Sequence, residues 1–118
     1  MIFGPNLVGK VLDGTKTVTR RRLTHRDGRD IRYRVGRTYA VQPGRGKPHV
    51  GHIRVLSVLA EPLCRMTDWD LRNEGFESRF EFESYWQRLH GSYDPDEPVA
   101  VIRFELADRC PRCTEWAP

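Results

Sequence analysis

The chain has 118 residues, of which 38% are hydrophobic, and this fits one compact domain with a single core but not two. No run approaches the roughly 18 apolar residues of a membrane span, and the N-terminus lacks the basic-then-apolar pattern of a signal peptide. We therefore expect a cytoplasmic protein with no membrane partner. Three cysteines, an odd number, do not suggest a secreted disulfide framework.

The net charge of +4 conceals a strong asymmetry along the chain. Residues 1–60 carry 13 Lys and Arg against 3 Asp and Glu, whereas residues 61–118 carry 7 against 13. The basic half is a candidate for binding phosphate or another anion. The alternative is that the two halves neutralise each other across the folded surface, and charge alone leaves both interpretations open.

The first predicted element is a short helix over residues 5–13, where apolar residues recur at helical spacing and Gly14 ends the segment. Residues 14–22 follow, with one lysine, three threonines and three arginines in nine positions. Threonine and valine favour extended backbone, and consecutive arginines are costly to bury. This stretch therefore predicts a basic strand over 16–22 that presents polar groups to a groove.

A polar loop is expected over residues 25–30, and alternation predicts strands over 36–42 and 49–59. The loop between these strands, residues 43–48, is rich in glycine, proline and positive charge. Such a loop either approaches a phosphate closely or is a plain hairpin connection, and we favour the hairpin.

Two helices are predicted in the acidic half, because Thr67 with Asp70 and Ser78 with Glu81 have the spacing of helix N-terminal caps. The first covers residues 68–74, and the second ends near Gly91. Its stripe of Phe82, Tyr85, Trp86 and Leu89 is better explained as core than as a platform for stacking bases. A last strand over 99–106 precedes a tail, residues 107–118. The element order predicts an α+β domain over 1–106, with a small β-barrel and flanking helices.

Four segments together resemble the ASCH domain family of the PUA-like superfamily. They are Gly14-x-Lys16-x-x-x-x-Arg21 after a helix, Val35-Gly36-Arg37, Gly75-Phe76 between two helices, and the closing strand Val99-Ala100-Val101-Ile102-Arg103-Phe104. The resemblance implies a PUA-like barrel and a ligand that is RNA, a nucleoside or a nucleotide. One bacterial branch, the N4-acetylcytidine amidohydrolases, uses a Thr-Lys-Glu triad. The matching positions here are Lys16, Thr19 and Glu74.

The chemistry of this triad is complete without a cofactor or metal. A neutral, desolvated Lys16 can remove the proton of the Thr19 hydroxyl, and Glu74 can orient the lysine or carry a proton to the departing amine. Arg21 is placed to bind substrate or stabilise an oxyanion. However, Lys16 and Thr19 have opposite parity in an ideal strand, so the triad requires Lys16 to lie in the turn or a bulge to intervene. The structural alternative is a solvated lysine, a surface threonine and an ordinary helix-terminal carboxylate.

Further residues are candidates for substrate binding. Arg20 and Arg22 flank the signature and suit phosphate pairing, and Tyr39 has a ring that can stack on a base or simply pack on the sheet. The sequence thus leaves three functions open: an amidohydrolase, a non-catalytic RNA-binding module and, less favoured, a ribonuclease. Cys110 and Cys113 have the spacing of half a zinc site, but a reduced tail explains them better.

Overall fold

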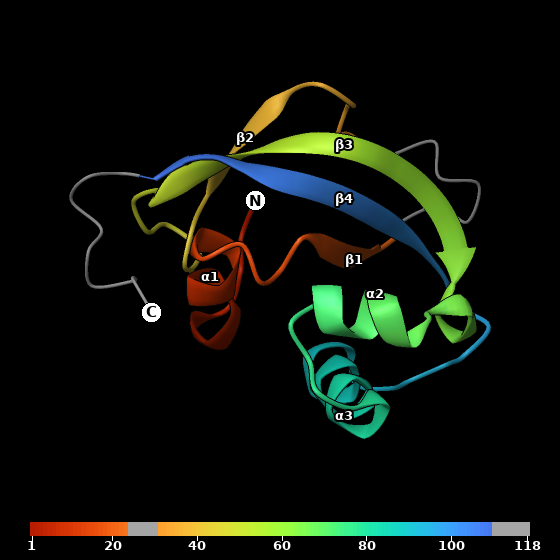
Figure 1. Ribbon diagram of the computed structural model, residues 1–118. Coiled ribbons are helices and arrows are strands. Elements are labelled where there is room, and N and C mark those ends of the chain that lie inside the picture. The colour runs from red at the N-terminus through yellow and green to blue at the C-terminus, as the bar shows by residue number, and fades with distance from the viewer. Residues whose placement is uncertain (24–30, 110–118) are drawn as a thin grey trace.

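The computed structural model describes residues 1–23 and 31–109 and shows an α+β architecture (Figure 1). A sheet formed mainly by two long strands arches over the helices, with one helix beneath one end and two beneath the other. The elements, in chain order, are α1 (Pro5–Leu12), β1 (Val18–Arg22), β2 (Thr38–Val41), β3 (Gly51–Pro62), the short 3-10 helix η1 (Leu63–Arg65), α2 (Asp68–Asn73), α3 (Arg79–His90) and β4 (Pro98–Arg109).

All pairings within the sheet are antiparallel, in the order β1-β4-β3-β2. The α+β class is confirmed, but the described strands do not show the predicted small barrel, because β1 and β2 are the two edges of the sheet and do not pair with each other. Part of the gap is filled by the N-terminus. On the β2 side, the N–H of Phe3 donates to Gln42 O at 2.9 Å. On the β1 side, the Arg21 side chain donates to Ile2 O.

The helices bury the faces that the sequence predicts. In α1 the buried residues are Leu7, Val8, Val11 and Leu12. Thr67 and Ser78 cap α2 and α3, since each hydroxyl accepts the N–H three residues later at 3.1 Å. Of the predicted aromatic stripe of α3, Phe82 and Trp86 are buried, but Leu89 remains 60% exposed.

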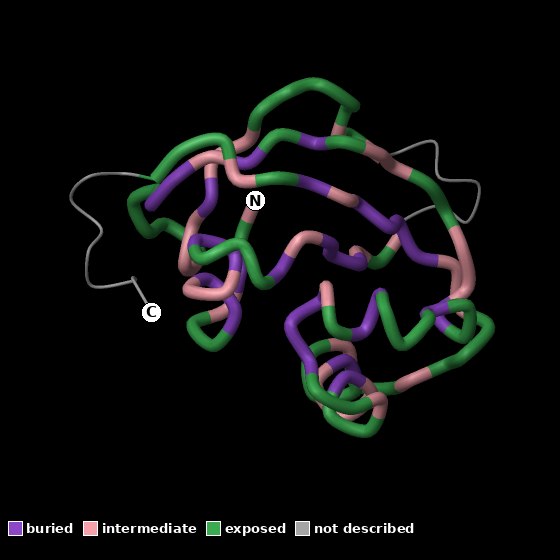
Figure 2. The backbone as a smooth tube through the Cα atoms, viewed as in Figure 1, coloured by how far each residue is buried: buried purple, intermediate pink, exposed green. Residues whose placement is uncertain are grey.

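The main core lies between the sheet and the helices, along the buried segments in Figure 2. A second cluster of Val55, Ala100 and Ile102 lies on the other side of the central strands. Strand β4 continues to Arg109, three residues beyond the predicted strand end, because it remains paired with Gly51 of β3. The predicted loop 25–30 and the Cys110–Cys113 pair lie outside the described residues. Within residues 1–23 and 31–109, no helix is long and apolar enough to cross a membrane.

Candidate functional site

Lys16 lies in the connection before β1, held between two helices. Its N–H donates to Lys10 O at 2.9 Å near the end of α1, and the next N–H, of Thr17, donates to Asn73 O of α2 at 2.8 Å. Gly14, with φ of 84°, allows the left-handed turn that leads into this connection. Since Lys16 is outside the strand, the strand's alternation does not decide where its side chain points.

The Lys16 amine is buried and fully hydrogen bonded. The side chain is 2% exposed, and Nζ donates to Val18 O at 2.9 Å, Glu74 O at 2.9 Å and Glu74 Oε1 at 3.0 Å. Glu74 is itself buried and occupies the C-terminal cap of α2. Three acceptors match the three hydrogens of an ammonium group, so this geometry favours the charged lysine. The carboxylate supplies its counter-charge.

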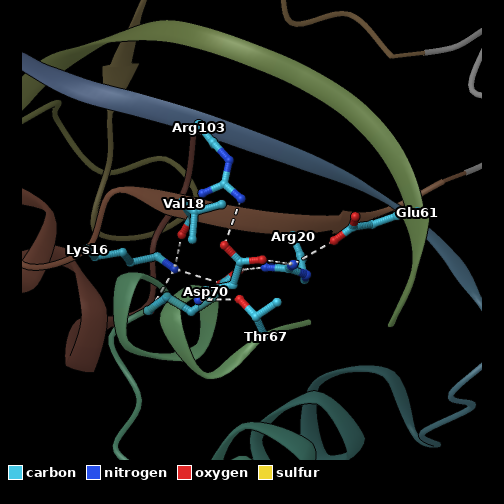
Figure 3. Close-up of polar contacts among 8 residues, drawn as sticks. Lys16, Val18, Arg20, Glu61, Thr67, Asp70 and Arg103 are labelled. Carbon is cyan, nitrogen blue, oxygen red and sulfur yellow. Dashed lines mark hydrogen bonds and ion pairs between the residues drawn. The ribbon is translucent and has the colours of Figure 1, made fainter. Parts of the chain in front are cut away.

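A second cation shares this carboxylate. The Arg20 side chain is fully buried and donates to Glu74 Oε2 at 3.3 Å, Asp70 Oδ2 at 3.2 Å and Glu61 Oε1 at 2.9 Å (Figure 3). Arg103 of β4 donates to the other oxygen of Asp70 at 2.7 Å. We call the six side chains the buried ion network: Lys16, Arg20, Glu61, Asp70, Glu74 and Arg103. It joins β1, β3, β4 and α2.

Burial and charge pairing shift pKa values in this network. Burial lowers the pKa of Lys16 below its usual value, although Glu74 partly opposes the shift. The lysine therefore loses its proton more readily than a surface lysine, even though its contacts suit the ammonium form. For Asp70, burial alone would raise the pKa, but Arg103 and Arg20 together hold it below the usual value.

A small pocket of about 80 Å³ lies along the free edge of β1, and we call it the edge pocket. It is bounded by residues before α1, by β1, by the end of α2 and by α3. Its lining includes Phe3, Lys16, Thr19, Arg20, Arg21, Arg22, Glu74, Tyr85, Trp86 and His90. Consecutive residues of β1 line the pocket, although their side chains alternate between the two faces of the sheet, because the pocket lies at the edge of the strand. This explains how Lys16 and Thr19 line the same pocket.

The main chain of Arg20 also faces the edge pocket. The carbonyl of Thr17 accepts the Phe104 N–H of β4, whereas the carbonyl of Val18 accepts from Lys16 on the other side. In an antiparallel ladder alternate residues face the same way, so Arg20, like Val18, directs its N–H and C=O away from β4. Arg20 is 4% exposed while its side chain is 0% exposed, so its main chain provides the exposed surface.

The predicted site residues occupy distinct positions. Thr19 is buried and lines the edge pocket, but among the described residues no hydrogen bond joins its hydroxyl to Lys16 or Glu74. Arg22 is half exposed, pairs with Glu97 at 2.8 Å and also lines the pocket. Tyr39 lies elsewhere: its hydroxyl accepts the Arg34 N–H at 2.7 Å, and its ring packs edge-on against Tyr33.

Arg20 and Arg21 differ from each other in their partners. Arg20 is enclosed by carboxylates, so the structure gives it the role of holding Glu74 and Asp70, and its predicted contact with substrate stays a prediction. Arg21 lies over the Phe3 ring, 5.1 Å from its centre, and donates to Ile2 O at 2.8 Å. It lines the pocket with its charge directed to no carboxylate among the described residues.

Sequence reasoning missed three members of the buried ion network. Asp70 was interpreted only as part of a helix start, and neither Glu61 nor Arg103 was selected. One signal was available for Arg103, a charged residue within an apolar strand. The described residues contain no group of three or more His, Cys, Asp or Glu side chains placed to hold a metal ion. The prediction that no metal or cofactor is needed stays a prediction.

Comparison with solved structures shows the same fold in bacterial proteins. Protein EF3133 from Enterococcus faecalis V583 matches with a TM-score of 0.73 and 18% identity, covering 94% of this chain and 82% of the other. An ASCH domain from Lactobacillus crispatus JV V101 matches with a TM-score of 0.64 and 18% identity, covering 86% and 70%. ASCH from Zymomonas mobilis gives 0.60 at 14% identity, covering 98% and 75%.

Comparison with curated proteins finds no match to the chain. The family model of the ASCH domain, in contrast, matches residues 1–108, which is nearly the whole chain. The lysine and arginine of the sequence signature lie together at the edge pocket, and the fold is that of solved ASCH domains. The chain belongs to the ASCH domain family.

Proposed function

We propose that the edge pocket hydrolyses the exocyclic amide of N4-acylated cytidine. The observation that carries the proposal is the buried Lys16–Glu74 pair, with 3.0 Å between Nζ and Oε1, in a pocket that also contains Thr19. A desolvated lysine beside a carboxylate is a recognised route to a base active near neutral pH. The ASCH family alone does not specify this activity.

The reaction follows from the roles of three side chains. Lys16 passes a proton to Glu74 and, as a neutral amine, accepts the proton of the Thr19 hydroxyl while Thr19 Oγ1 bonds to the amide carbon. The tetrahedral intermediate then expels the N4 nitrogen, which takes the proton back from Lys16 and leaves as the amino group of cytidine. Neutral Lys16 takes a proton from a water molecule as its oxygen bonds to the acyl carbon of the threonine ester, and it returns this proton to Thr19 Oγ1 as the ester bond breaks and the carboxylic acid leaves. Lys16 and Glu74 recover their original protons.

Contacts between Lys16 and Thr19 must form when substrate enters. Catalytic hydrogen bonds often tighten only in the complex, so their absence between these described residues does not oppose the proposal. The N–H and C=O of Arg20, which the strand register directs away from β4, supply recognition in this proposal, because an acylated cytosine presents an N4–H donor beside the N3 acceptor. The N4–H of the base would donate to the C=O of Arg20, and N3 would accept from its N–H, as the main chain of a paired strand does.

Chromatographic detection of cytidine from N4-acetylcytidine tests the activity. We expect Thr19→Ala and Lys16→Met to abolish turnover, while Thr17→Ala leaves it unchanged. Thr17 is the matched control because it lies in the same segment but does not line the edge pocket. No turnover by the wild-type protein on a panel of acylated cytidines contradicts the proposal.

A non-catalytic RNA-binding module is the second candidate, and one observation favours it. Every hydrogen of the Lys16 ammonium already has an acceptor, which is also what a purely structural lysine requires. ASCH domains are associated with RNA binding in general. This function predicts RNA affinity that falls steeply with salt and with Arg22→Gln, in the absence of hydrolysis. Cleavage of that RNA would instead support the ribonuclease alternative.

A further inference from the structure

Arg21 is a largely buried cation that forms no direct ion pair among the described residues, and Glu74 acts on it only from beyond ion-pair distance. Its neighbours on β1 each form ion pairs: Arg20 pairs with three carboxylates, and Arg22 pairs with Glu97. Within residues 1–23 and 31–109, Arg21 donates only to the carbonyl of Ile2, and its buried Nε has no hydrogen-bond partner. A buried charge without an ionic partner is costly, so this position suits an anion supplied from outside the chain.

A second pocket adjoins this arginine, with a volume of about 380 Å³. We call it the arginine pocket, and its lining includes Arg21, Arg22, Leu23, Arg32, Tyr33 and Ala100. No Asp or Glu belongs to the described lining. Burial, and after it the charges of Arg21 and Arg32, lower the pKa of the Met1 amine, which places both arginines within electrostatic reach of this group. In the described part of the chain, three arginines therefore line this pocket without an acidic side chain in the lining.

The two pockets share Arg21 and Arg22 in their linings. The edge pocket, at about 80 Å³, is well below the roughly 300 to 1,000 Å³ typical of small-molecule sites, whereas the arginine pocket lies within that range. A ligand whose reacting group enters the edge pocket must therefore extend beyond it. Because Arg21 and Arg22 line both pockets, a negatively charged part of that ligand would be stabilised where it extends from the edge pocket into the arginine pocket.

We propose that the arginine pocket binds a phosphate group of the substrate through Arg21 and Arg32, so that a nucleotide or a nucleotide unit of RNA binds more tightly than the corresponding neutral nucleoside. An arginine guanidinium group binds two oxygens of a phosphate at once, through two parallel N–H donors. The Arg32 guanidinium lies 5.5 Å from the centre of the Tyr33 ring, so an aromatic surface lies beside the site. The nature of the base rests on the proposed function, but the phosphate preference does not.

Calorimetric titration of the full chain with cytidine, 5′-cytidine monophosphate, 3′-cytidine monophosphate and the dinucleotide CpC tests this proposal. We expect at least one phosphate-bearing ligand to bind about tenfold more tightly than cytidine, as one charge-assisted contact typically provides. Arg32→Gln should remove that gain and leave cytidine affinity unchanged. Arg54→Gln is the matched control, since it removes an exposed arginine on β3 that lines neither pocket.

Preference for CpC identifies the phosphodiester of RNA as the ligand, and preference for a monophosphate identifies a free nucleotide. Equal affinities for cytidine and all three phosphate-bearing ligands overturn the proposal, and so does an absence of binding by all three phosphate-bearing ligands. An equal loss with Arg32→Gln and Arg54→Gln also overturns it, because the effect would then be general charge. The titration measures binding and not turnover, so a phosphate preference here, together with no cytidine release in the chromatographic assay, refutes the proposed function alone.

Discussion

Replacing Lys16 by methionine tests whether the buried ion network is as tightly coupled as its distances indicate. The substitution keeps the apolar volume and removes the charge from a side chain that is 2% exposed. Glu74 then keeps only Arg20, at 3.3 Å, and the carbonyls of Val18 and Glu74 lose a donor. Removing one partner of a buried pair costs about 3–5 kcal/mol, and the remaining arginine places the loss near the lower end.

A loss of about 3 kcal/mol corresponds to a fall in melting temperature of about 12 °C, given an unfolding entropy of about 2.1 cal/mol/K for each residue. Urea unfolding and calorimetry at pH 7 measure both quantities. In the double variant Lys16→Met/Glu74→Gln the loss should be smaller than the sum of the single losses, because the uncompensated carboxylate is gone.

Lys10→Met is the matched control. Lys10 is also close to the end of α2, where its amine donates to the carbonyl of Gly75, but it has no carboxylate partner among the described residues. We expect it to cost about 1 kcal/mol, as a single hydrogen bond does. Equal losses for Lys10→Met and Lys16→Met would refute the reasoning, since the ion pair would then contribute nothing beyond an ordinary hydrogen bond.

The remaining predictions concern activity and pH. Thr19→Ser should retain measurable amide hydrolysis and Thr19→Ala none, with both variants folding normally by circular dichroism; equal activity would exclude Thr19 as the nucleophile. Because burial lowers the pKa of Lys16, kcat/KM should rise with pH and level off below pH 10.5, and a flat profile would contradict a lysine base. Asp70 has a lowered pKa in the folded state, so its contribution is present above pH 3.8 and lost as the pH falls through the folded value. Asp70→Asn should therefore cost about 3 kcal/mol at pH 7 in urea unfolding and approach the wild type in acid, whereas an unchanged difference would refute the linkage.

The spacing of apolar residues and the helix cap residues were sufficient to predict the helices and most of the strands. The spacing of apolar residues in α1 and the cap residues Thr67 and Ser78 predicted elements that the structure confirms. Leu89 is exposed although it belongs to the predicted apolar stripe of α3. Helical periodicity predicts which residues share a face, but not how much of that face other elements cover. The described strands do not show the predicted small barrel, because strand order depends on pairings between distant segments that no local pattern specifies.

The sequence by itself determined the family, the helix boundaries to within a residue or two, and the identity of Lys16, Thr19 and Glu74 as candidates. Only the tertiary structure decided which arginines are already paired with carboxylates and which are available to bind a ligand. Arg20 and Arg21 are adjacent and identical in type, yet Arg20 is enclosed by three carboxylates from β3 and α2, whereas Arg21 forms an ion pair with none among the described residues. The reason is physical: the free energy of a buried charge depends on partners that are up to 54 residues away in the chain and meet it only in the folded state.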